Sequence, residues 1–496
     1  MKEKNSFYIT TTLPYVNAPL HMGHALEFVR ADTIVRYKKL RDFDVYFNTG
    51  TDEHGLKIYE KAKEKNIEIQ KFVDQGFEIF KEQLKMFGVS ENVHFVRTTD
   101  QHHETAAQEF WQRVKNNGYI YKKSYQAKYC IGCESEKTDS ELNEKGECEI
   151  HPGQALELIN EENYFFKLSE FGDKLLEFYD KNPNFIVPDF RLNEMKNFIR
   201  NGLRDFSISR LKEKMPWGIS VPGDDTQVMY VWFDALVNYI STLGWPENNM
   251  EKSLENTRDK ISENLFQKFW INGNPTQYCG KDNTRFQAVM WQAMLMAANL
   301  PNSHQIIVNG FITGEGGIRM SKTLGNVVDP RDIVKEYGTD ALRYFLLREV
   351  SSFEDSPFTI DRFKNAYNSG LANGLGNLTS RILTLSEKYL EKCLEIPEKN
   401  DFTEYFGIYE TFDIKKAMDY IWNKISGLDE FIQKNEPFKV VKVDEKKGKE
   451  LISYMVINLY QIARMLNPVM PETNILLKKL IKENKKPEQP LFLRKE

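Results

Sequence analysis

Two histidines near the N-terminus have the spacing needed to contact a phosphate group. His21 and His24 lie three residues apart, with Gly23 between them, soon after the apolar run at residues 7–9. At the start of a helix this spacing places both imidazoles on one face, and the helix N-terminus adds backbone amides and a positive dipole end. Donors of this kind stabilise charge that develops on phosphorus during transfer. A turn with two incidental histidines is the alternative for this segment alone.

A basic loop flanked by glycines lies far downstream. Gly316 and Gly317 lead into Arg319 and Lys322. Two cations in a mobile loop are suited to neutralising phosphate oxygens, and arginine adds a fork of donors. Together, and in this order, the two segments resemble the HIGH-type and KMSKS-type motifs of class I aminoacyl-tRNA synthetases.

The resemblance implies an ATP site, with Mg²⁺ accompanying the nucleotide. Lys322 would neutralise the pyrophosphate that leaves, and Arg319 stands where the motif usually carries a lysine. Gly280-Lys-Asp282 matches a further family element, in which the acidic residue binds an ATP ribose hydroxyl. The catalytic and ATP-binding positions carried over from the family are His21, Gly23, His24, Gly280, Asp282, Arg319 and Lys322.

Three of the five cysteines form a strong metal-binding pattern with one histidine. Cys130 and Cys133 make a C-x2-C pair, and Cys148 and His151 make a C-x2-H pair shortly afterwards. Each pair can form a tight turn with two ligands, and four protein ligands leave no open position on zinc. We therefore expect one structural Zn²⁺ ion; chance clustering of cysteines is the alternative.

The elements that must position these residues follow a strand–helix alternation. Residues 7–10 and 43–48 are predicted strands, and residues 23–41 have helical periodicity between them. This βαβ unit predicts a parallel sheet with its ligand at the carboxyl ends of the strands, where residues 14–24 and 49–55 fall. The next strand, at residues 93–96, precedes a helix that we expect to begin after Asp100 and to stop at Gly118.

The residue pattern then changes twice, at about residues 119 and 228. Short alternating runs from residue 119 predict a partly β insert, and helix–strand alternation resumes near residue 228. Long helical patterns at 363–395, 412–435 and 449–466 predict a helical bundle, with a charged loop at 439–449 and a partly ordered tail at 482–496. The predicted fold is α/β: a Rossmann-type nucleotide-binding domain split by a zinc-bearing connective insert and followed by an α-helical bundle. Its expected parts are the first Rossmann half at 1–118, the insert at 119–227, the second Rossmann half at 228–325, a linker with the mobile loop at 326–362 and the bundle at 363–496.

Composition limits the class of protein. The 496 residues are 41% hydrophobic and 28% charged, which is ordinary for a water-soluble chain. We expect a cytoplasmic protein, because no run approaches a membrane span and no signal peptide precedes the first strand. The net charge of −5 gives no overall attraction to nucleic acid, so RNA would need a local basic patch. Residues 36–41 are one candidate, with a solvated helix face as the alternative.

Across nearly the whole chain the resemblance is closest to the methionyl-tRNA synthetases. It implies that Asp52 holds the substrate ammonium, helped by the backbone of Leu13. Asn283 and Gln287 depart from the family pattern of an apolar residue and a histidine. The methionine-binding positions carried over are Leu13, Tyr15, Asp52, Trp232, Ala235, Leu236, Tyr239, Gln287 and Trp291.

The C-terminal helices resemble the anticodon-binding domain of the same family. The resemblance implies that Asn377 and Arg381 contact anticodon bases. Phe438 stands where the family usually has tryptophan, and a phenylalanine ring can still stack on a base. The alternative for Asn377 and Arg381 is that they cap a helix or face solvent.

These resemblances imply a methionine–tRNA ligase with ATP, L-methionine and tRNA(Met) as partners and no membrane partner. The short sequence past the bundle makes a monomer the expectation. Three alternatives stay open: a class I synthetase for leucine, valine, isoleucine or cysteine, a non-catalytic tRNA-binding paralogue, or a small-molecule nucleotidyltransferase. The short span between the two ATP motifs leaves no room for the editing domain of the leucine, valine and isoleucine enzymes.

Overall fold

A computed structural model describes residues 5–133, 135–137, 141–246, 264–318, 320, 328–391, 394 and 402–496. The chain divides into two compact units, and both are discontinuous in sequence. The first contains residues 1–20, 43–82 and 92–308, and the second contains residues 21–42, 83–91 and 309–496. None of the helices in the described ranges is long and apolar enough to span a membrane.

The first unit is built on a six-stranded sheet. Its strand order is β3 (Val93–Arg97), β2 (Asp44–Thr51), β1 (Ser6–Thr10), β12 (Thr276–Gly280), β13 (Gln305–Asn309) and β7 (Ile186–Val187). The β1–β2, β1–β12, β2–β3 and β13–β7 pairs are all parallel. The first five strands follow the doubly wound order 3-2-1-4-5, in which β12 and β13 are the fourth and fifth strands.

This order confirms the predicted Rossmann-type sheet and locates its switch point. The chain leaves β1 toward β2 on one side, while β12 pairs with β1 on the other. Ligands of such sheets bind outside the carboxyl ends of the strands that flank the switch point. Here those ends are Thr10 and Gly280.

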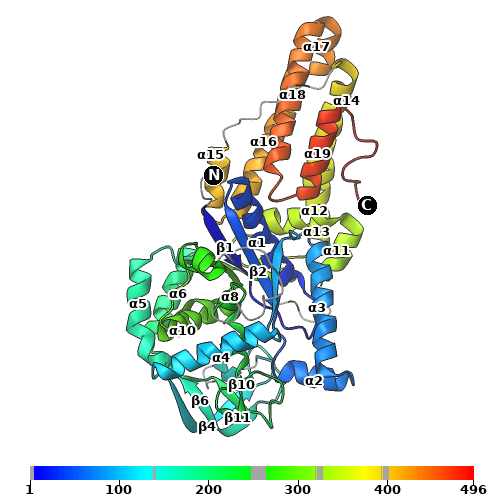
Figure 1. The fold of residues 1–496 in the computed structure, drawn as a ribbon. Coiled ribbons are helices and arrows are strands. Elements are labelled where there is room, and N and C mark those ends of the chain that lie inside the picture. The colour runs from blue at the N-terminus through cyan, green and yellow to red at the C-terminus, as the bar shows by residue number, and fades with distance from the viewer. Residues whose placement is uncertain are drawn as a thin grey trace, which may run out of the picture. The chain divides into compact units, whose positions relative to one another are not determined.

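Helices and short turns surround the sheet of the first unit (Figure 1). Their amphipathic faces supply a continuous core that includes Phe110, Trp111, Phe233 and Trp291. The helices are α2 (Leu56–Glu64), α3 (Ile69–Met86), α4 (Gln101–Asn116), α5 (Gly172–Lys181), α6 (Asp189–Arg200), α7 (Val231–Ala235), α8 (Asn238–Ser241) and α10 (Trp291–Ala297), with the shorter turns η2 (Leu168–Phe171), η4 (Phe266–Ile271), η5 (Lys281–Asn283) and η6 (Phe286–Met290).

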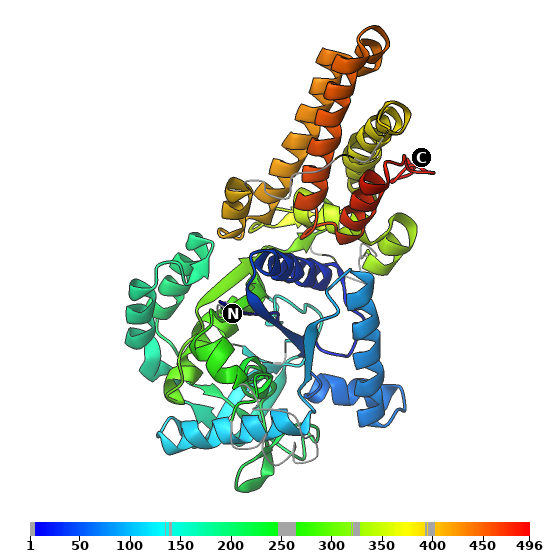
Figure 2. The ribbon, with the colours of Figure 1, turned by 45° about the horizontal axis from the view of Figure 1, so that its top comes forward.

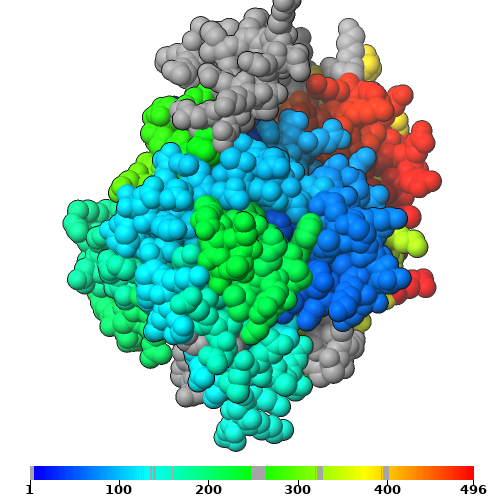
Figure 3. Space-filling view, turned by 60° about the horizontal axis from the view of Figure 1, so that its bottom comes forward, coloured from blue at the N-terminus to red at the C-terminus, as the bar shows by residue number. Residues whose placement is uncertain are grey.

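The expected β insert lies between β3 and β12 in sequence. One antiparallel sheet has the order β5 (Ser135–Lys137), β4 (Ile120–Cys130), β6 (Glu157–Phe166) and β8 (Phe206–Ser207), and another has the order β10 (Ser220–Val221), β11 (Asp224–Met229) and β9 (Ser209–Leu211). The β10–β11 hairpin packs against α4, where Gln108 Nε2 donates to Ser220 O at 3.3 Å. Figure 3 shows this hairpin as a green surface beside the cyan surface of α4.

The second unit is mainly helical, as predicted for the C-terminal part. Helices α14, α16, α18 and α19 lie side by side, with α17 at one end (Figures 1 and 2). Its elements are α1 (Met22–Leu40), β14 (Ile312–Thr313), η7 (Glu315–Gly317), α11 (Pro330–Tyr337), α12 (Thr339–Tyr344), η9 (Phe345–Glu349), β15 (Ser356–Pro357), α13 (Ile360–Ala366), η10 (Tyr367–Gly376), α14 (Asn377–Tyr389), α15 (Thr403–Tyr409), α16 (Ile414–Asn435), α17 (Pro437–Val443), α18 (Glu445–Met465) and α19 (Pro471–Glu483).

Helix α1 belongs to this second unit because two buried arginines fasten it there. Arg30 donates to Asn309 Oδ1 at 2.7 Å and to the carbonyls of residues 350–352. Arg343 pairs with Asp32 at 2.9 Å, and both side chains are fully buried. Arg343 also donates to Val469 O at 2.9 Å and Pro468 O at 3.0 Å. Burying a guanidinium is costly unless such partners surround it, so these contacts define the position of α1.

The expectation of a loop in the bundle was wrong. The charged stretch 439–449 is helical, because Asp444 caps α18 by accepting from Lys447 N at 3.0 Å and Glu445 pairs with Lys449 one turn later. In the tail after α19, Phe492 is buried and Tyr367 OH donates to Leu493 O at 3.0 Å, whereas most side chains of residues 482–490 are exposed. A run of charges does not oppose a helix when the charges fall at i and i+4.

Most basic side chains of residues 36–41 already contact other groups of the second unit. Arg36 pairs with Asp32 at 2.7 Å, and Lys38 pairs with Glu410 at 2.9 Å. The guanidinium of Arg41 lies 5.4 Å from the centre of the Phe406 ring. Arg36 also donates to Gly88 O at 3.0 Å, so all three of these cations are engaged in contacts within the second unit.

Candidate functional site

His21 and His24 form a reciprocal cap at the N-terminus of α1. His21 Nδ1 accepts from the backbone N–H groups of Gly23 at 3.1 Å and His24 at 3.4 Å, and the His21 N–H donates to His24 Nδ1 at 3.3 Å. The two rings stack with centroids 3.7 Å apart. The spacing therefore brings both imidazoles together, as predicted.

The cap also determines which ring nitrogens carry protons. Because Nδ1 accepts a hydrogen bond in both histidines, each neutral ring carries its proton on Nε2. Burial and the neighbouring His21 hold the pKa of His24 well below its ordinary value of 6.5. At neutral pH His24 therefore carries no charge, and its remaining donor is Nε2–H.

Gly23 is required by this cap. A Cβ at position 23 would lie 3.0 Å from His21 Cε1 and 3.2 Å from His21 Nδ1, so the ring would have to move. The backbone amides of Gly23 and His24, which we expected to be available to phosphate, are bonded to His21. Arg319 and Lys322 lie outside the described residues.

Gly280 and Asp282 follow the carboxyl end of β12, at the switch point of the sheet. Asp282 lies in the short turn η5 and is exposed. A Cβ at position 280 would lie 2.7 Å from Asp282 Oδ1, so a glycine there lets the carboxylate fold back over the strand end. Asn283, in the same turn, is half-buried.

Asp52 lies at the carboxyl end of β2 and is 4% exposed. Its segment continues the parallel ladder through an isolated bridge with Tyr15, and its backbone N–H donates to Pro14 O at 3.0 Å. Leu13 and Tyr15 are half-buried in the loop that follows β1. The structure therefore brings Asp52 and Tyr15 together, next to the switch point.

Tyr239, Gln287 and Trp291 form one buried cluster, as the family resemblance implied. Gln287 Nε2 donates to Tyr239 OH at 2.5 Å, and Gln277 Nε2 donates to Gln287 Oε1 at 2.9 Å. The rings of Tyr239 and Trp291 meet edge to face with centroids 5.8 Å apart. Ser303 Oγ donates to Gln277 Oε1 at 2.7 Å. The hydrogen bonds between Gln277, Gln287 and Tyr239 therefore fix the orientation of Gln287. Its role could not be predicted from the sequence.

Trp232 is half-buried at the start of α7. Its ring stacks on Phe286 with centroids 3.8 Å apart and planes 3° from parallel. Its Nε1 is buried without a hydrogen-bond partner among the described residues. Ala235 and Leu236, on the same segment, are 7% and 2% exposed.

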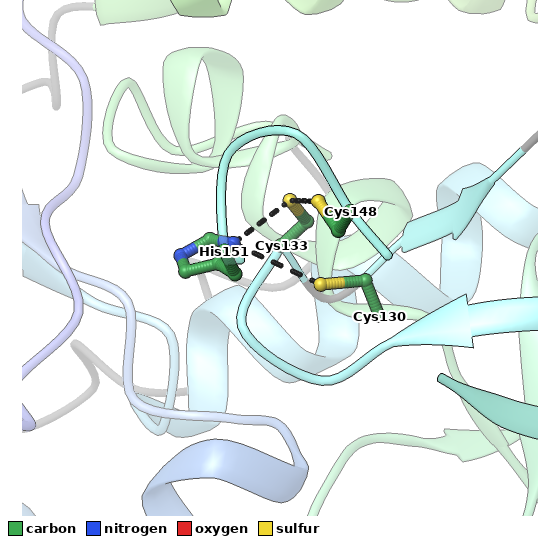
Figure 4. A group of neighbouring side chains, drawn as sticks. All are labelled: Cys130, Cys133, Cys148 and His151. Carbon is green, nitrogen blue, oxygen red and sulfur yellow. Dashed lines mark hydrogen bonds between the residues drawn. The ribbon is translucent and has the colours of Figure 1, made fainter. Parts of the chain in front are cut away.

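The four predicted metal ligands converge. The ligand atoms of Cys130, Cys133, Cys148 and His151 all lie within 4.8 Å of one another (Figure 4). Cys133 Sγ is 3.5 Å from Cys148 Sγ and 3.2 Å from His151 Nδ1, and Cys130 Sγ is 3.7 Å from His151 Nδ1. A tetrahedral zinc ion with Zn–S about 2.3 Å and Zn–N about 2.0 Å would hold its ligands roughly 3.5–3.8 Å apart. The donor set can therefore hold a metal ion.

The cysteines of this cluster differ in how readily they ionise. Although burial opposes ionisation, the backbone N–H groups of His151 and Ile150 lower the pKa of the Cys148 thiol. Burial raises the pKa of Cys133 to about 12 in the metal-free protein. Gly132 brings the backbone under the imidazole: a Cβ there would lie 2.7 Å from His151 Cγ.

The three predicted anticodon residues lie in the second unit. Asn377 is exposed at the first position of α14. Arg381, one turn later, pairs with Asp429 of α16. Phe438, near the start of α17, is 39% exposed, and Lys439 Nζ lies 5.9 Å from the centre of its ring. Asn377 and Phe438 are therefore accessible, whereas Arg381 is already paired.

Sequence reasoning missed several residues that hold the site together. His103, Gln277 and Ser303 were not identified, and His54 and Asp234 were noticed only as parts of matching stretches. Their partners lie far away in sequence, as for His54 and Asp234, whose separation is 180 residues. The only local signal was the unusual density of polar residues directly after Asp52.

Known proteins share both the sequence and the fold. A sequence model of the family described as tRNA synthetases class I (M) matches residues 7–155 and 144–383. The methionine–tRNA ligase of Caldanaerobacter subterraneus is 39% identical over 490 residues, which cover 95% of this chain and 73% of that protein. The methionine–tRNA ligase of Rickettsia bellii is 38% identical, with 95% of this chain and 91% of that protein covered.

A solved structure agrees with these relatives. The methionyl-tRNA synthetase of Mycobacterium tuberculosis, in complex with methionyl-adenylate, superposes with a TM-score of 0.87 at 32% sequence identity. The match covers 96% of this chain and 94% of that one.

Proposed function

Because the chain belongs to the class I methionyl-tRNA synthetases, we propose that it activates L-methionine with ATP and transfers the methionine to tRNA(Met). The observation that supports this most directly is the likeness to a synthetase in complex with methionyl-adenylate, over nearly the whole of both chains. The carboxylate of methionine attacks the α-phosphate of ATP, the bond to the β-phosphate breaks, and pyrophosphate leaves. The terminal ribose of tRNA then takes the methionyl group, and AMP is released.

We propose that His21 and His24 act in the first step as hydrogen-bond donors to phosphate oxygens, with His24 as a neutral ring. Their Nδ1 atoms are engaged in the helix cap, which leaves Nε2–H as the donor on each ring. Lys322 and Arg319 would neutralise the pyrophosphate, and Mg²⁺ would arrive with ATP as part of the substrate. Asp282 would bind the ribose, with Gly280 allowing close approach. Positioning and charge stabilisation account for catalysis of this type.

We propose that methionine binds where the Asp52 segment approaches α7 and α8. Asp52 would hold the ammonium group, because a buried carboxylate pairs strongly with a cation once water is excluded. The side chain would lie among aromatic and aliphatic groups, and contacts between sulfur and rings contribute about 0.3–1.5 kcal/mol each. The residues assigned to this site are Leu13, Tyr15, Asp52, Trp232, Ala235, Leu236, Tyr239, Gln287 and Trp291.

The cysteine and histidine cluster would hold one structural Zn²⁺ ion. Three thiolates and one imidazole saturate a tetrahedral ion, so the metal would stabilise the insert and would not bind substrate. In the second unit, Asn377 and Phe438 would contact anticodon bases, and Arg381 would do so only by leaving Asp429. A monomeric, cytoplasmic enzyme is part of the same proposal.

Pyrophosphate exchange measured with each amino acid in turn tests the proposal. Methionine should support the fastest exchange, and preference for leucine or cysteine would contradict the substrate assignment. No exchange with any amino acid would favour a non-catalytic tRNA-binding paralogue. Lys322→Ala should depress exchange far more than methionine binding measured by calorimetry, and equal loss of both would contradict its role at the leaving group.

A further inference from the structure

A single buried carboxylate joins two histidines in the first unit. Asp234 Oδ2 lies 2.9 Å from His54 Nδ1, and Asp234 Oδ1 lies 3.4 Å from His103 Nε2. His103 Nδ1 lies 2.9 Å from Ser241 Oγ, so the chain of contacts has four members. All four are at most 3% exposed, and Asp234 is fully buried.

The four members come from four different segments. His54 follows β2 two residues after Asp52, Asp234 lies in α7 between Trp232 and Ala235, His103 lies in α4, and Ser241 ends α8. A second contact joins the same elements, because Asn48 Nδ2 of β2 donates to Asn238 Oδ1 of α8 at 2.9 Å. The network thus ties the segment from Asn48 to His54, which contains Asp52, to the helices that carry the aromatic residues of the proposed methionine site.

The charges around the network favour an ionised Asp234 carboxylate. Burial opposes charge on both partners, but Asp234 raises the pKa of His54, and His54 and His103 lower the pKa of Asp234. Glu104, nearby on α4, has its pKa raised by burial. Glu53 is engaged elsewhere, with Arg97 at 2.8 Å. A lone buried carboxylate would be strongly unfavourable, so the two imidazoles are needed for Asp234 to stay in place.

We propose that Asp234, through His54 and His103, is a positioning residue that sets the methionine site by holding the Asp52 segment against α7 and α8. The proposal rests on the proposed function. None of the three side chains is assigned to contact substrate. In the described part of the chain the geometry of a metal site is confined to the Cys130 cluster, which does not include His54, His103 or Asp234.

Steady-state pyrophosphate exchange with Asp234→Asn tests this proposal. The substitution keeps the shape of the side chain but removes the charge that draws both imidazoles inward. We expect the KM for methionine to rise at least tenfold, because misplacement of binding groups by about 1 Å costs roughly a hundredfold in turnover efficiency. The KM for ATP should stay within about twofold, since Gly280 and Asp282 follow a different strand.

Matched variants separate positioning from general stability. Asp205→Asn removes another carboxylate of the same unit, one that accepts from Tyr121 OH at 2.9 Å and Ser169 Oγ at 2.6 Å, and both KM values should be unchanged. Ser241→Ala trims only the far end of the network and should give a smaller rise in the KM for methionine than Asp234→Asn. It also serves as the test if Asp234→Asn does not fold.

The outcomes are distinguishable. A lower melting temperature with unchanged KM values, or equal changes in the KM values for methionine and ATP, would overturn the positioning role. Wild-type protein that shows no exchange with methionine would instead refute the proposed function. A selective rise in the KM for methionine in Asp234→Asn, graded through Ser241→Ala and absent in Asp205→Asn, is the expected result.

Discussion

The substitution Gly132→Ala, which adds one methyl group, is a sharp test of the proposed zinc site. In Gly132→Ala the new Cβ would lie 2.7 Å from His151 Cγ, 2.8 Å from His151 Cδ2 and 2.7 Å from Gln154 Oε1. Ordinary contacts of a Cβ begin at 3.4 Å, so the imidazole would have to retreat by about 0.6–0.7 Å. Metal–ligand distances tolerate only about 0.2 Å.

The expected result is a weaker metal site in a folded protein. Changes that misorient one ligand typically reduce metal affinity about 10–100-fold, which corresponds to about 1.4–2.7 kcal/mol. Competition for Zn²⁺ against a chromophoric chelator, under reducing conditions, measures this directly. Gly172→Ala is the matched control, because its Cβ would meet only Ile199 Cγ2, at 3.8 Å, and its affinity for Zn²⁺ should equal that of the wild type.

Equal zinc affinity in Gly132→Ala and wild type would refute the reasoning. It would mean that the ring of His151 can move without loss of coordination, or that His151 is not a ligand. Loss of zinc from Gly172→Ala as well would show that the assay reports general destabilisation of the first unit.

Three further predictions use other parts of the molecule. Gln287→Met leaves Tyr239 OH without its amide donor and should lower the free energy of unfolding of the first unit by about 1–3 kcal/mol, measured in denaturant, and the KM for methionine in pyrophosphate exchange should also rise; an unchanged KM would contradict the assignment of Gln287 to the site. Arg343→Met leaves Asp32 buried without its main cation and should destabilise the second unit by about 3–5 kcal/mol, measured by denaturant unfolding, whereas an effect below about 1 kcal/mol would contradict the importance of this pair. Because the folded pKa of His24 is depressed, the unfolded chain binds more protons below pH 6.5, so stability should fall as the pH drops from there, and His24→Asn should flatten that part of a melting-temperature profile; parallel profiles would refute it.

Local patterns were sufficient to predict much of the fold. The strands at residues 7–10 and 43–48 and the intervening helix are found as β1, β2 and α1, because each shows one clear periodicity between recognisable ends. The metal cluster was also predictable, because its ligands form two pairs, each only three residues apart in sequence. Asp100 does precede α4, although its side chain makes no capping hydrogen bond there.

Long-range partnerships were not predictable in this way. Nothing near Asp234 or Gln287 in sequence indicates that they meet His54 and Tyr239, because those contacts depend on how the segments pack. The capping role of His21 was also missed, since histidine is not among the residues that usually cap helices. Its Nδ1 replaces the short side-chain oxygen because the ring folds back over Gly23.

The attachment of α1 has a consequence for how the protein can be divided. The helix that begins with His21 keeps its place through Arg30 and Arg343, whose partners are Asn309, residues 350–352 and the turn before α19. A fragment that ends after β13 would retain every strand of the parallel sheet and Asn309, but it would lose residues 350–352 and Arg343, which hold Arg30 and Asp32 of α1. Proteolytic trimming or evolutionary exchange of the C-terminal helices would therefore disturb the histidine pair itself, and the bundle is not a detachable module.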